Sequence, residues 1–211
     1  MAYNLQEQEQ LDELKAFWNN YGTAILAAIT LALFIFAGYR GWGWYQTSQA
    51  TAAAGIYAEL SSAVSARNLE QVRSRSADLL DRYGSTAYGQ MAGLMAARGY
   101  VDGNDPAAAK VALQWVIDHA KDLEFKQIAR LRLAGLLLDE KAYDDALKTI
   151  DPAAVGTASG EMAAGFADRR ADILVAQGQV DAAKAEYRQA LDQLPQQAAL
   201  RQLVQLKLDA L

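Results

Sequence analysis

Few residues of this 211-residue chain stand in a pattern that could carry out chemistry. His119 is the only histidine and cysteine is absent, so the chain has no histidine pair for a metal and no thiol nucleophile. Four carboxylates gather around one predicted turn: Asp139, Glu140, Asp144 and Asp145. They lack the spacing of an EF-hand and are interpreted as a solvated turn, with a calcium site as the alternative. We expect no catalytic residues, no cofactor and no metal, and therefore no enzyme.

The stretch 16–39 contains no charged side chain and lies between Lys15 and Arg40. About 20 apolar residues in a helix cross the hydrocarbon of a bilayer, so this stretch predicts a transmembrane helix. Aromatic residues, which favour the headgroup level, flank it at both ends: Trp18, Tyr21, Tyr39, Trp42, Trp44 and Tyr45. With these flanks the predicted membrane segment covers 16–45 and follows a short polar tail at 1–15.

A cleaved signal peptide and a buried core helix are the alternatives to a retained anchor. A secretory signal has a basic start and a shorter apolar run, whereas this N-terminus is acidic; only the small residues at 50–54 favour cleavage. A core helix shows a polar face at helical spacing, which this run lacks. Charge does not orient the anchor, because Lys15 and Arg40 are the only basic side chains within about 20 residues of its ends.

The remaining residues, 46–211, are enough for one domain with a core of its own. Apolar residues make up 52% of the whole chain and prolines number three, which together with the many alanines and leucines predicts an almost entirely helical domain. The net charge of −5 and the lack of a basic stripe disfavour nucleic acid as a partner.

Small residues recur in this domain with a period of 37 residues, as helix pairs need where their backbones cross closely. The predicted packing positions are Ala97, Ala109, Ala134, Ala146, Ala171 and Ala183, joined in the last unit by Tyr187 and Ala190. Turn signals at 102–106, 140–143 and 177–179 predict helix–turn–helix pairs. A degenerate first pair is placed around Leu60 and Val72, loops at 118–124 and 153–160, and a capping helix at 197–211.

The last unit resembles the tetratricopeptide repeat in the run Ala171-x6-Gly178-x4-Ala183-x3-Tyr187-x2-Ala190-x4-Pro195. The preceding unit has Lys141 at the position of the turn glycine, and the unit before it has Pro106 where its second helix begins. The resemblance implies an all-α fold, in which a single N-terminal transmembrane helix is followed by a tetratricopeptide-like helical-repeat solenoid. Such stacked pairs curve, and their first helices line a concave face suited to an extended segment or a partner helix.

The whole architecture is similar to the YfgM-type family of ancillary subunits of the bacterial Sec translocon, most specifically at 79–88, 112–122 and 130–134. This resemblance implies a single-pass inner-membrane protein with a cytoplasmic N-terminus and a periplasmic repeat domain at 46–211. It implies SecYEG and the membrane-anchored chaperone PpiD as partners, with translocated secretory proteins as clients. The alternative is a structural assembly scaffold for other envelope or membrane complexes that binds no clients.

Small residues at four-residue spacing also occur within the predicted anchor, at Ala24, Ala28 and Ala32. Such a stripe lets a second transmembrane helix approach closely, so these residues are candidates for contact inside the membrane. The alternative is that alanine is simply common throughout this chain.

Overall fold

The computed structural model describes the backbone of residues 5–211 and the side chains of residues 9–211; residues 1–4 of the predicted tail lie outside the described residues. In the described range the chain forms ten α-helices and no strands, which confirms the all-α prediction. The chain divides into two compact units, the first ending at Ser48 and the second covering Gln49–Leu211.

Helix α1 spans Leu5–Ser65 and passes from the first unit into the second. Of the described helices it alone is long and apolar enough to cross a membrane, and only 6% of its most apolar 18-residue window is buried. The Oγ1 of Thr30 donates to the carbonyl of Leu26 at 2.8 Å, so the one polar group at the centre of this stretch is satisfied within the helix. This stretch is therefore not buried in the core of the described chain.

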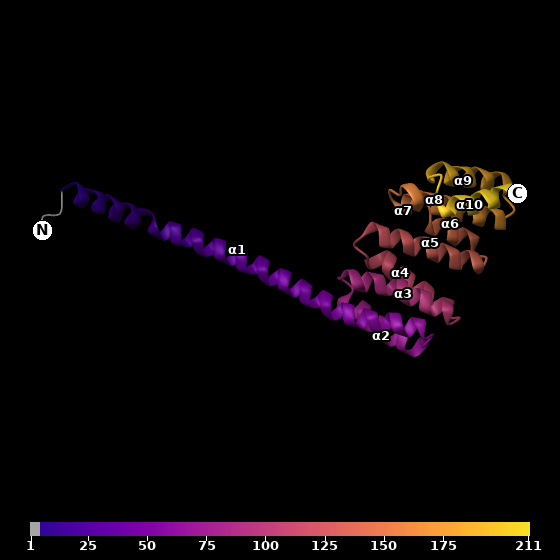
Figure 1. Cartoon of the computed structure of the whole chain (residues 1–211), viewed down its shortest axis with the longest axis horizontal. Coiled ribbons are helices and arrows are strands. Elements are labelled where there is room, and N and C mark those ends of the chain that lie inside the picture. Colours follow the sequence, from indigo (N-terminus) through magenta and orange to yellow (C-terminus); the bar gives the residue numbers. More distant parts are fainter. Residues whose placement is uncertain (1–4) are drawn as a thin grey trace. The chain divides into compact units, whose positions relative to one another are not determined.

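The second unit contains four helix pairs, which Figure 1 shows stacked in chain order from purple to yellow. The end of α1 pairs with α2, as the ion pair of Glu59 with Arg75 at 2.9 Å illustrates. The remaining helices are α2 (Leu69–Tyr83), α3 (Ala87–Asp102), α4 (Pro106–His119), α5 (Leu123–Asp139), α6 (Tyr143–Thr149), α7 (Pro152–Val155), α8 (Gly160–Ala176), α9 (Val180–Gln193) and α10 (Ala199–Asp209). Pairs α3–α4, α5–α6 and α8–α9 follow, with α10 packed on α9.

All four pairs turn in the same way. The turn residues Arg67, Asn104, Lys141 and Gly178 follow one another at 37-residue steps, with φ values of 53°, 60°, 61° and 78°. In the last turn the N–H of Gly178 donates to the carbonyl of Val175 and that of Gln179 to Leu174, and the other three turns repeat these two bonds. This is the Schellman arrangement, which satisfies carbonyls at the end of a helix. The backbone therefore repeats with the period seen in the sequence, starting from the first pair.

The predicted packing positions all lie in the core of the second unit. Their exposures are 2% for Ala97, 0% for Ala109, Ala134, Ala146, Ala171, Ala183 and Ala190, and 3% for Tyr187. Leu60 and Val72, which take the alanine places in the first pair, are 0% and 1% exposed. Buried apolar side chains thus continue through the stack, although burial alone does not test whether these sites must be small.

The two predicted loops are shorter than expected because helices extend into both, and buried amides bond to the residues that remain non-helical. Between α4 and α5 only residues 120–122 are non-helical, and the Oε1 of buried Gln90 accepts the N–H of Lys121 at 3.1 Å. The segment 153–160 contains most of α7, since Asp151 caps this helix through the N–H of Ala153 at 2.8 Å. The Nε2 of buried Gln127 donates to the carbonyl of Thr157 at 3.0 Å. The spacing of apolar residues in the sequence does not predict these polar contacts.

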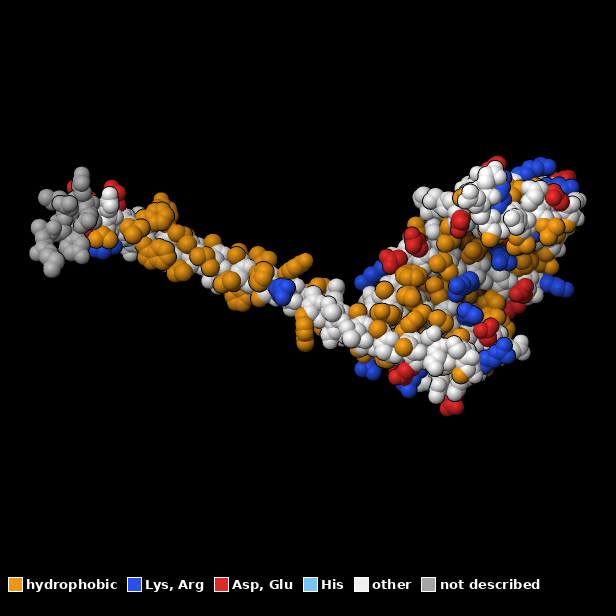
Figure 2. Space-filling model, in the orientation of Figure 1, with side chains coloured by type: hydrophobic (Ala, Val, Ile, Leu, Met, Phe, Trp, Pro, Cys, Tyr) orange, Lys and Arg blue, Asp and Glu red, His pale blue; other side chains and the backbone are white. Residues whose placement is uncertain are grey.

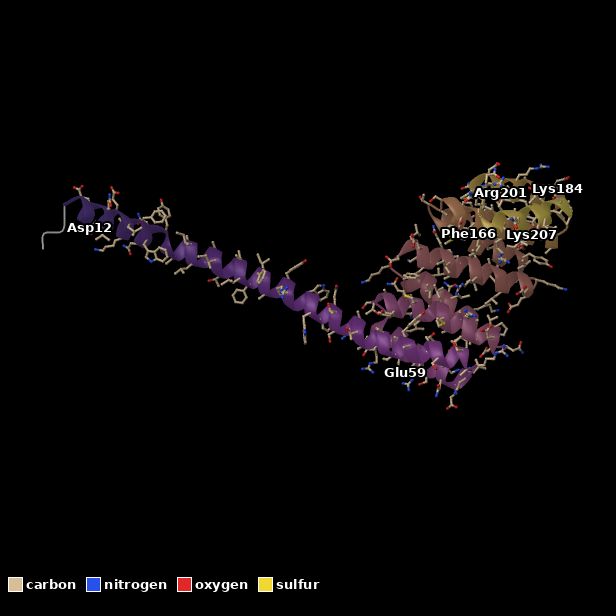
Figure 3. The ribbon with its side chains drawn as sticks, in the orientation of Figure 1. Asp12, Glu59, Phe166, Lys184, Arg201 and Lys207 are labelled. Atoms are coloured by element: carbon tan, nitrogen blue, oxygen red, sulfur yellow. The ribbon has the colours of Figure 1, made fainter. Side chains whose placement is uncertain are left out.

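The capping helix α10 is fixed by charged side chains, two of which Figure 3 labels. The Nζ of Lys207 lies 2.8 Å from a carboxylate oxygen of Asp168 and 2.9 Å from one of Asp172. Arg201 donates to the carbonyls of Leu191 and Leu194 at 2.6 and 2.9 Å. These bonds satisfy the end of α9 and join the last helix to α8.

Candidate functional site

A groove of about 330 Å³ crosses the first helices of three successive pairs. Helix α3 contributes Ala97, Arg98, Val101 and Asp102; α4 contributes Leu113; α5 contributes Arg132, Gly135, Leu136 and Asp139; and α8 contributes Arg169. Val101 is 46% exposed and Leu136 is half-buried, so apolar surface is open to solvent beside the charged groups. We call this site the arginine groove.

Arg132 on α5 is the central cation of the arginine groove. One of its Nη atoms donates to the carbonyl of Leu94 on α3 at 3.2 Å, which orients the guanidinium across the two helices. Partial desolvation, and then the neighbouring charge of Arg98, lower the pKa of Arg132. Two like charges therefore face the same groove and repel each other.

The other two arginines have only long ion pairs. The Nε of Arg98 is 3.7 Å from Asp102 and an Nη of Arg169 is 3.8 Å from Asp172. The Nε of Arg169 is buried without a hydrogen-bond partner among the described atoms. The guanidinium of Arg169 lies over Gly135, 3.6 Å from where a Cβ would stand, so the absence of a side chain lets the cation approach α5.

The histidine considered for chemistry in the sequence, His119, lies on the surface of α4. His119 stacks on Trp115 at 4.8 Å between ring centroids and its Nδ1 lies 2.9 Å from the carbonyl of the same residue, at the exposed end of α4. Trp115 itself covers Gly84, with its ring 2.9 Å from the position of a Cβ there, and so packs against the connection between the first two pairs.

The acidic cluster makes contacts with basic and amide groups. Glu140 pairs with Lys110 at 2.6 Å and Asp145 with Lys148 at 3.2 Å. Asp144 accepts from the Nε2 of Gln177 at 3.4 Å. Across the side chains that the structure describes, no three of His, Cys, Asp or Glu converge as metal ligands.

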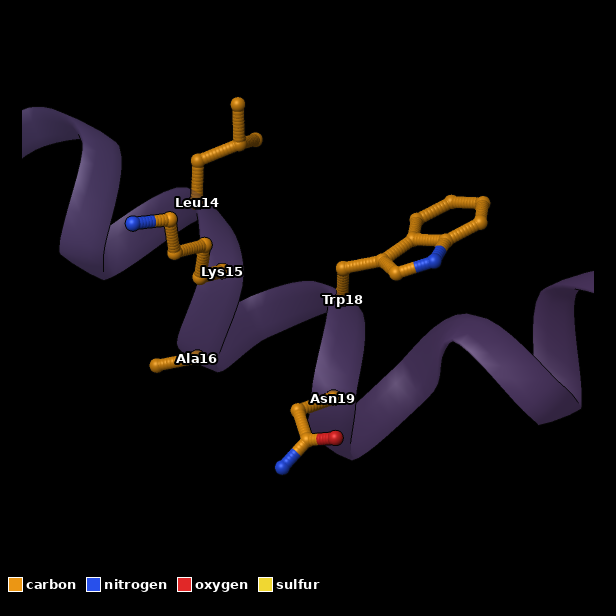
Figure 4. Close-up of a pocket in the computed structure, with 5 residues that line it drawn as sticks. All are labelled: Leu14, Lys15, Ala16, Trp18 and Asn19. Atoms are coloured by element: carbon orange, nitrogen blue, oxygen red, sulfur yellow. The ribbon is translucent and has the colours of Figure 1, made fainter.

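In the first unit, Ala24, Ala28 and Ala32 are exposed on α1. A hollow on the same helix is lined by Leu14, Lys15, Ala16, Trp18 and Asn19, and Figure 4 shows Leu14 and Trp18 projecting from one side. Because this lining comes from one helix, the hollow is open helix surface. A basic and an aromatic side chain together are typical of the headgroup level.

Sequence reasoning missed the arginine groove. Arg132 and Arg169 stand 37 residues apart and so occupy the same place in consecutive repeats, which is the signal that the repeat register offered. Arg98 has no arginine at its equivalent positions, where Gly135 and Asp172 stand, and only the fold brings it beside Arg132.

A family model described as "Tetratricopeptide repeat-like domain" matches residues 15–211. A curated relative from Neisseria gonorrhoeae named "Ancillary SecYEG translocon subunit" is 31% identical over 212 residues and covers 100% of both chains. The chain belongs to the YfgM-type family of tetratricopeptide repeat-like proteins. Two further relatives of that name are 29% identical over 208 residues in Escherichia coli, covering 97% of this chain and 96% of the relative, and 30% identical over 211 residues in Haemophilus influenzae, covering 96% and 98%.

No solved structure matches significantly. The family match begins at residue 15, just before the predicted anchor, and runs through α10, so it includes both the apolar helix and the whole repeat array of this chain. The resemblance found in the sequence is thereby confirmed for family and fold.

Proposed function

We propose that this protein is a membrane-anchored ancillary subunit of the SecYEG translocon. The observation that carries the proposal is the full-length similarity to a relative named "Ancillary SecYEG translocon subunit", which covers 100% of both chains. In this role the repeat unit binds other proteins in the periplasm and carries out no reaction of its own. It works with the chaperone PpiD on proteins that leave the channel.

The proposal requires that α1 stays attached to the repeats, and the packing of Ala53 supports this. Ala53 belongs to the small-residue run at 50–54 and is 0% exposed in the core of the second unit. Cleavage within this run would remove part of the first helix pair and expose the core around Leu60. We therefore propose a retained single-pass anchor over 16–45, with the tail at 1–15 in the cytoplasm and the repeats at 46–211 in the periplasm.

Tethering to the membrane strengthens weak contacts between the repeats and the channel. Once the anchor holds the repeats in the same membrane as SecYEG, a second contact becomes intramolecular and is strengthened without new interactions. We propose that Ala24, Ala28 and Ala32 make one such contact with another transmembrane helix. Replacing all three by Leu is then expected to keep the protein inserted and to lower its co-purification with membrane partners, relative to wild type and to a variant carrying an unrelated single-span anchor.

Affinity purification of the full-length tagged protein from solubilised membranes tests the translocon association. SecYEG and PpiD are expected to be enriched over an abundant inner-membrane protein of unrelated function. Enrichment of folded envelope complexes without SecYEG would contradict the proposal and favour the assembly scaffold.

A further inference from the structure

The arginine groove is lined by Arg98, Arg132 and Arg169 and also by two carboxylates, Asp102 and Asp139, and Asp102 reaches only Arg98, at 3.7 Å. Arg132 takes part in no ion pair within the described part of the chain, and its hydrogen bond goes to a carbonyl. The carboxylates nearest Arg98 and Arg169 are 3.7 and 3.8 Å away, beyond the 2.7–2.9 Å typical of a charge-assisted bond. The groove therefore keeps capacity to bind an anion.

An anion in this place meets two cations at once, and because the side chain of Arg98 is 71% exposed, water screens its share of the attraction. The partial desolvation of Arg132 and its repulsion by Arg98 both oppose the charged form of Arg132, and a carboxylate between the two cations counters both. Guanidinium groups also match carboxylates geometrically, because their N–H groups donate as a planar fork. Charge complementarity thus points to a carboxylate as the ligand group.

The rest of the groove favours apolar neighbours on that ligand. Val101 and Leu136 expose apolar surface on α3 and α5, and Figure 2 shows hydrophobic side chains over the repeat unit with Lys and Arg side chains among them. A volume of about 330 Å³ lies at the lower end of the range of about 300–1,000 Å³ found for ligand sites. A few side chains of a ligand are enough to fill the groove.

The spacing of the helices sets the length of the ligand. Packed helices lie about 8–10 Å apart, so the path from α3 over α5 to α8 covers about 16–20 Å. An extended chain rises about 3.3 Å per residue, which gives five or six residues. Alternate side chains of such a segment point to the same side, so its first, third and fifth residues face the groove.

We propose that the arginine groove binds a short extended segment of a partner protein whose groove-facing residues are apolar, acidic and apolar. The central carboxylate pairs with Arg132 and Arg98, one apolar side chain contacts Val101 on α3, and the other lies between Leu136 on α5 and helix α8. This proposal concerns the groove alone and stands whether or not the chain associates with SecYEG.

The test is fluorescence anisotropy of the full-length protein in detergent micelles with a labelled, amidated peptide Gly-Leu-Ser-Glu-Ser-Leu-Gly. Amidation removes the terminal carboxylate, so the central Glu is the only carboxylate of the peptide chain. The Glu peptide is expected to bind about tenfold more tightly than its Gln counterpart, and the Lys counterpart is expected to bind weakest. Arg132→Met and Arg98→Met should each remove most of the preference for Glu, while Arg188→Met, at an exposed position on α9, should leave it unchanged.

A further variant separates a loss of binding from a loss of folding. Val101→Asp changes an exposed position and places a like charge beside the ligand, so the Glu peptide should bind at least about fivefold more weakly while the helix content is retained. Equal binding of the three peptides by folded wild type would overturn the proposal, as would equal losses in Arg188→Met and Arg132→Met. A dimer of the wild type that Arg132→Met dissociates, or binding of phosphatidylglycerol vesicles without the peptide preference, would assign the groove to another occupant.

Discussion

Lys141 and Gly178 occupy the same place in consecutive repeats, and both have left-handed backbone conformations, with φ of 61° and 78°. Each ends the first helix of its pair through the same two backbone hydrogen bonds. Glycine adopts this conformation freely, whereas a residue with a Cβ loses roughly 1–2 kcal/mol there. The third repeat keeps the turn geometry in spite of its side chain.

Exchanging these turn residues should change stability in opposite directions. Lys141→Gly is expected to raise the free energy of unfolding by about 0.5–1 kcal/mol, since the gain from relieved strain exceeds the added entropy of the unfolded chain. Gly178→Lys should lower it by about 1 kcal/mol, because no atom lies within 4 Å of a Cβ built there and only the backbone cost remains. Thermal unfolding of the full chain in detergent measures both; a less stable Lys141→Gly would contradict the account.

The buried repeat alanines should not tolerate larger side chains. Ala183→Leu is expected to lower the free energy of unfolding by about 1–3 kcal/mol, because the close-packed helix pair must move apart. The same range is expected at Ala134, Ala146 and Ala171. The neighbouring Ala182 is exposed, so Ala182→Leu should change stability by less than about 0.5 kcal/mol. If Ala183→Leu and Ala182→Leu unfold at the same temperature in the same detergent, the packing register is wrong.

The link between Lys207 and α8 should depend on pH. Burial, opposed by the bond from Lys207, raises the pKa of Asp168. When folding raises the pKa of an acid, the folded state loses stability as the pH rises through that folded-state pKa. Removing the Lys207 cation raises the folded-state pKa of Asp168 further. Lys207→Met is expected to cost about 1–3 kcal/mol at pH 7 and much less near pH 4, because Asp168 takes up a proton as the pH falls toward its raised pKa and then needs no cation beside it.

A matched control for this charge is Lys148→Met, at an ion pair whose lysine side chain is 77% exposed. Denaturant unfolding at the two pH values should show little change for Lys148→Met at either. A loss for Lys207→Met that is the same at pH 4 and pH 7 would show that packing, and not charge, is responsible.

The sequence predicted those features that depend on repetition and on apolar length. The apolar stretch at 16–39 and the alanines 37 residues apart were enough for the helix α1 and the register of the pairs. The first pair was degenerate in side chains, yet Arg67 adopts the same turn conformation as Gly178, because the turn is fixed by backbone bonds that many residues permit. The pattern of small residues in the sequence does not predict that these turns share one backbone conformation.

The polar contacts between repeats required the structure. Gln90 and Gln127 each bond to a connecting segment about 30 residues away, and neither lies in a motif. The arginine groove joins Arg98 to Arg132 through the packing of α3 against α5, which no spacing within one repeat reveals. Contacts of this kind depend on which helices become neighbours.

The orientation of the anchor is a prediction that a reporter fusion checks. A reporter active only outside the cytoplasm, fused after Leu211, is expected to be active, because the repeats are proposed to lie in the periplasm. Proteolysis of sealed inverted vesicles should remove the tail at 1–15. An inactive reporter together with a protected tail would place the repeats in the cytoplasm.

Photocrosslinking during secretion tests the central claim most directly. A photoreactive residue at Val101, in the arginine groove, is compared with one at Val111, which is 71% exposed on α4 and does not line the groove, while a secretory protein is arrested in the channel. The account predicts adducts with SecYEG or with the arrested chain, and more of them from position 101 than from position 111. Adducts only with folded envelope proteins, or equal yields from both positions with and without an arrested chain, would contradict it.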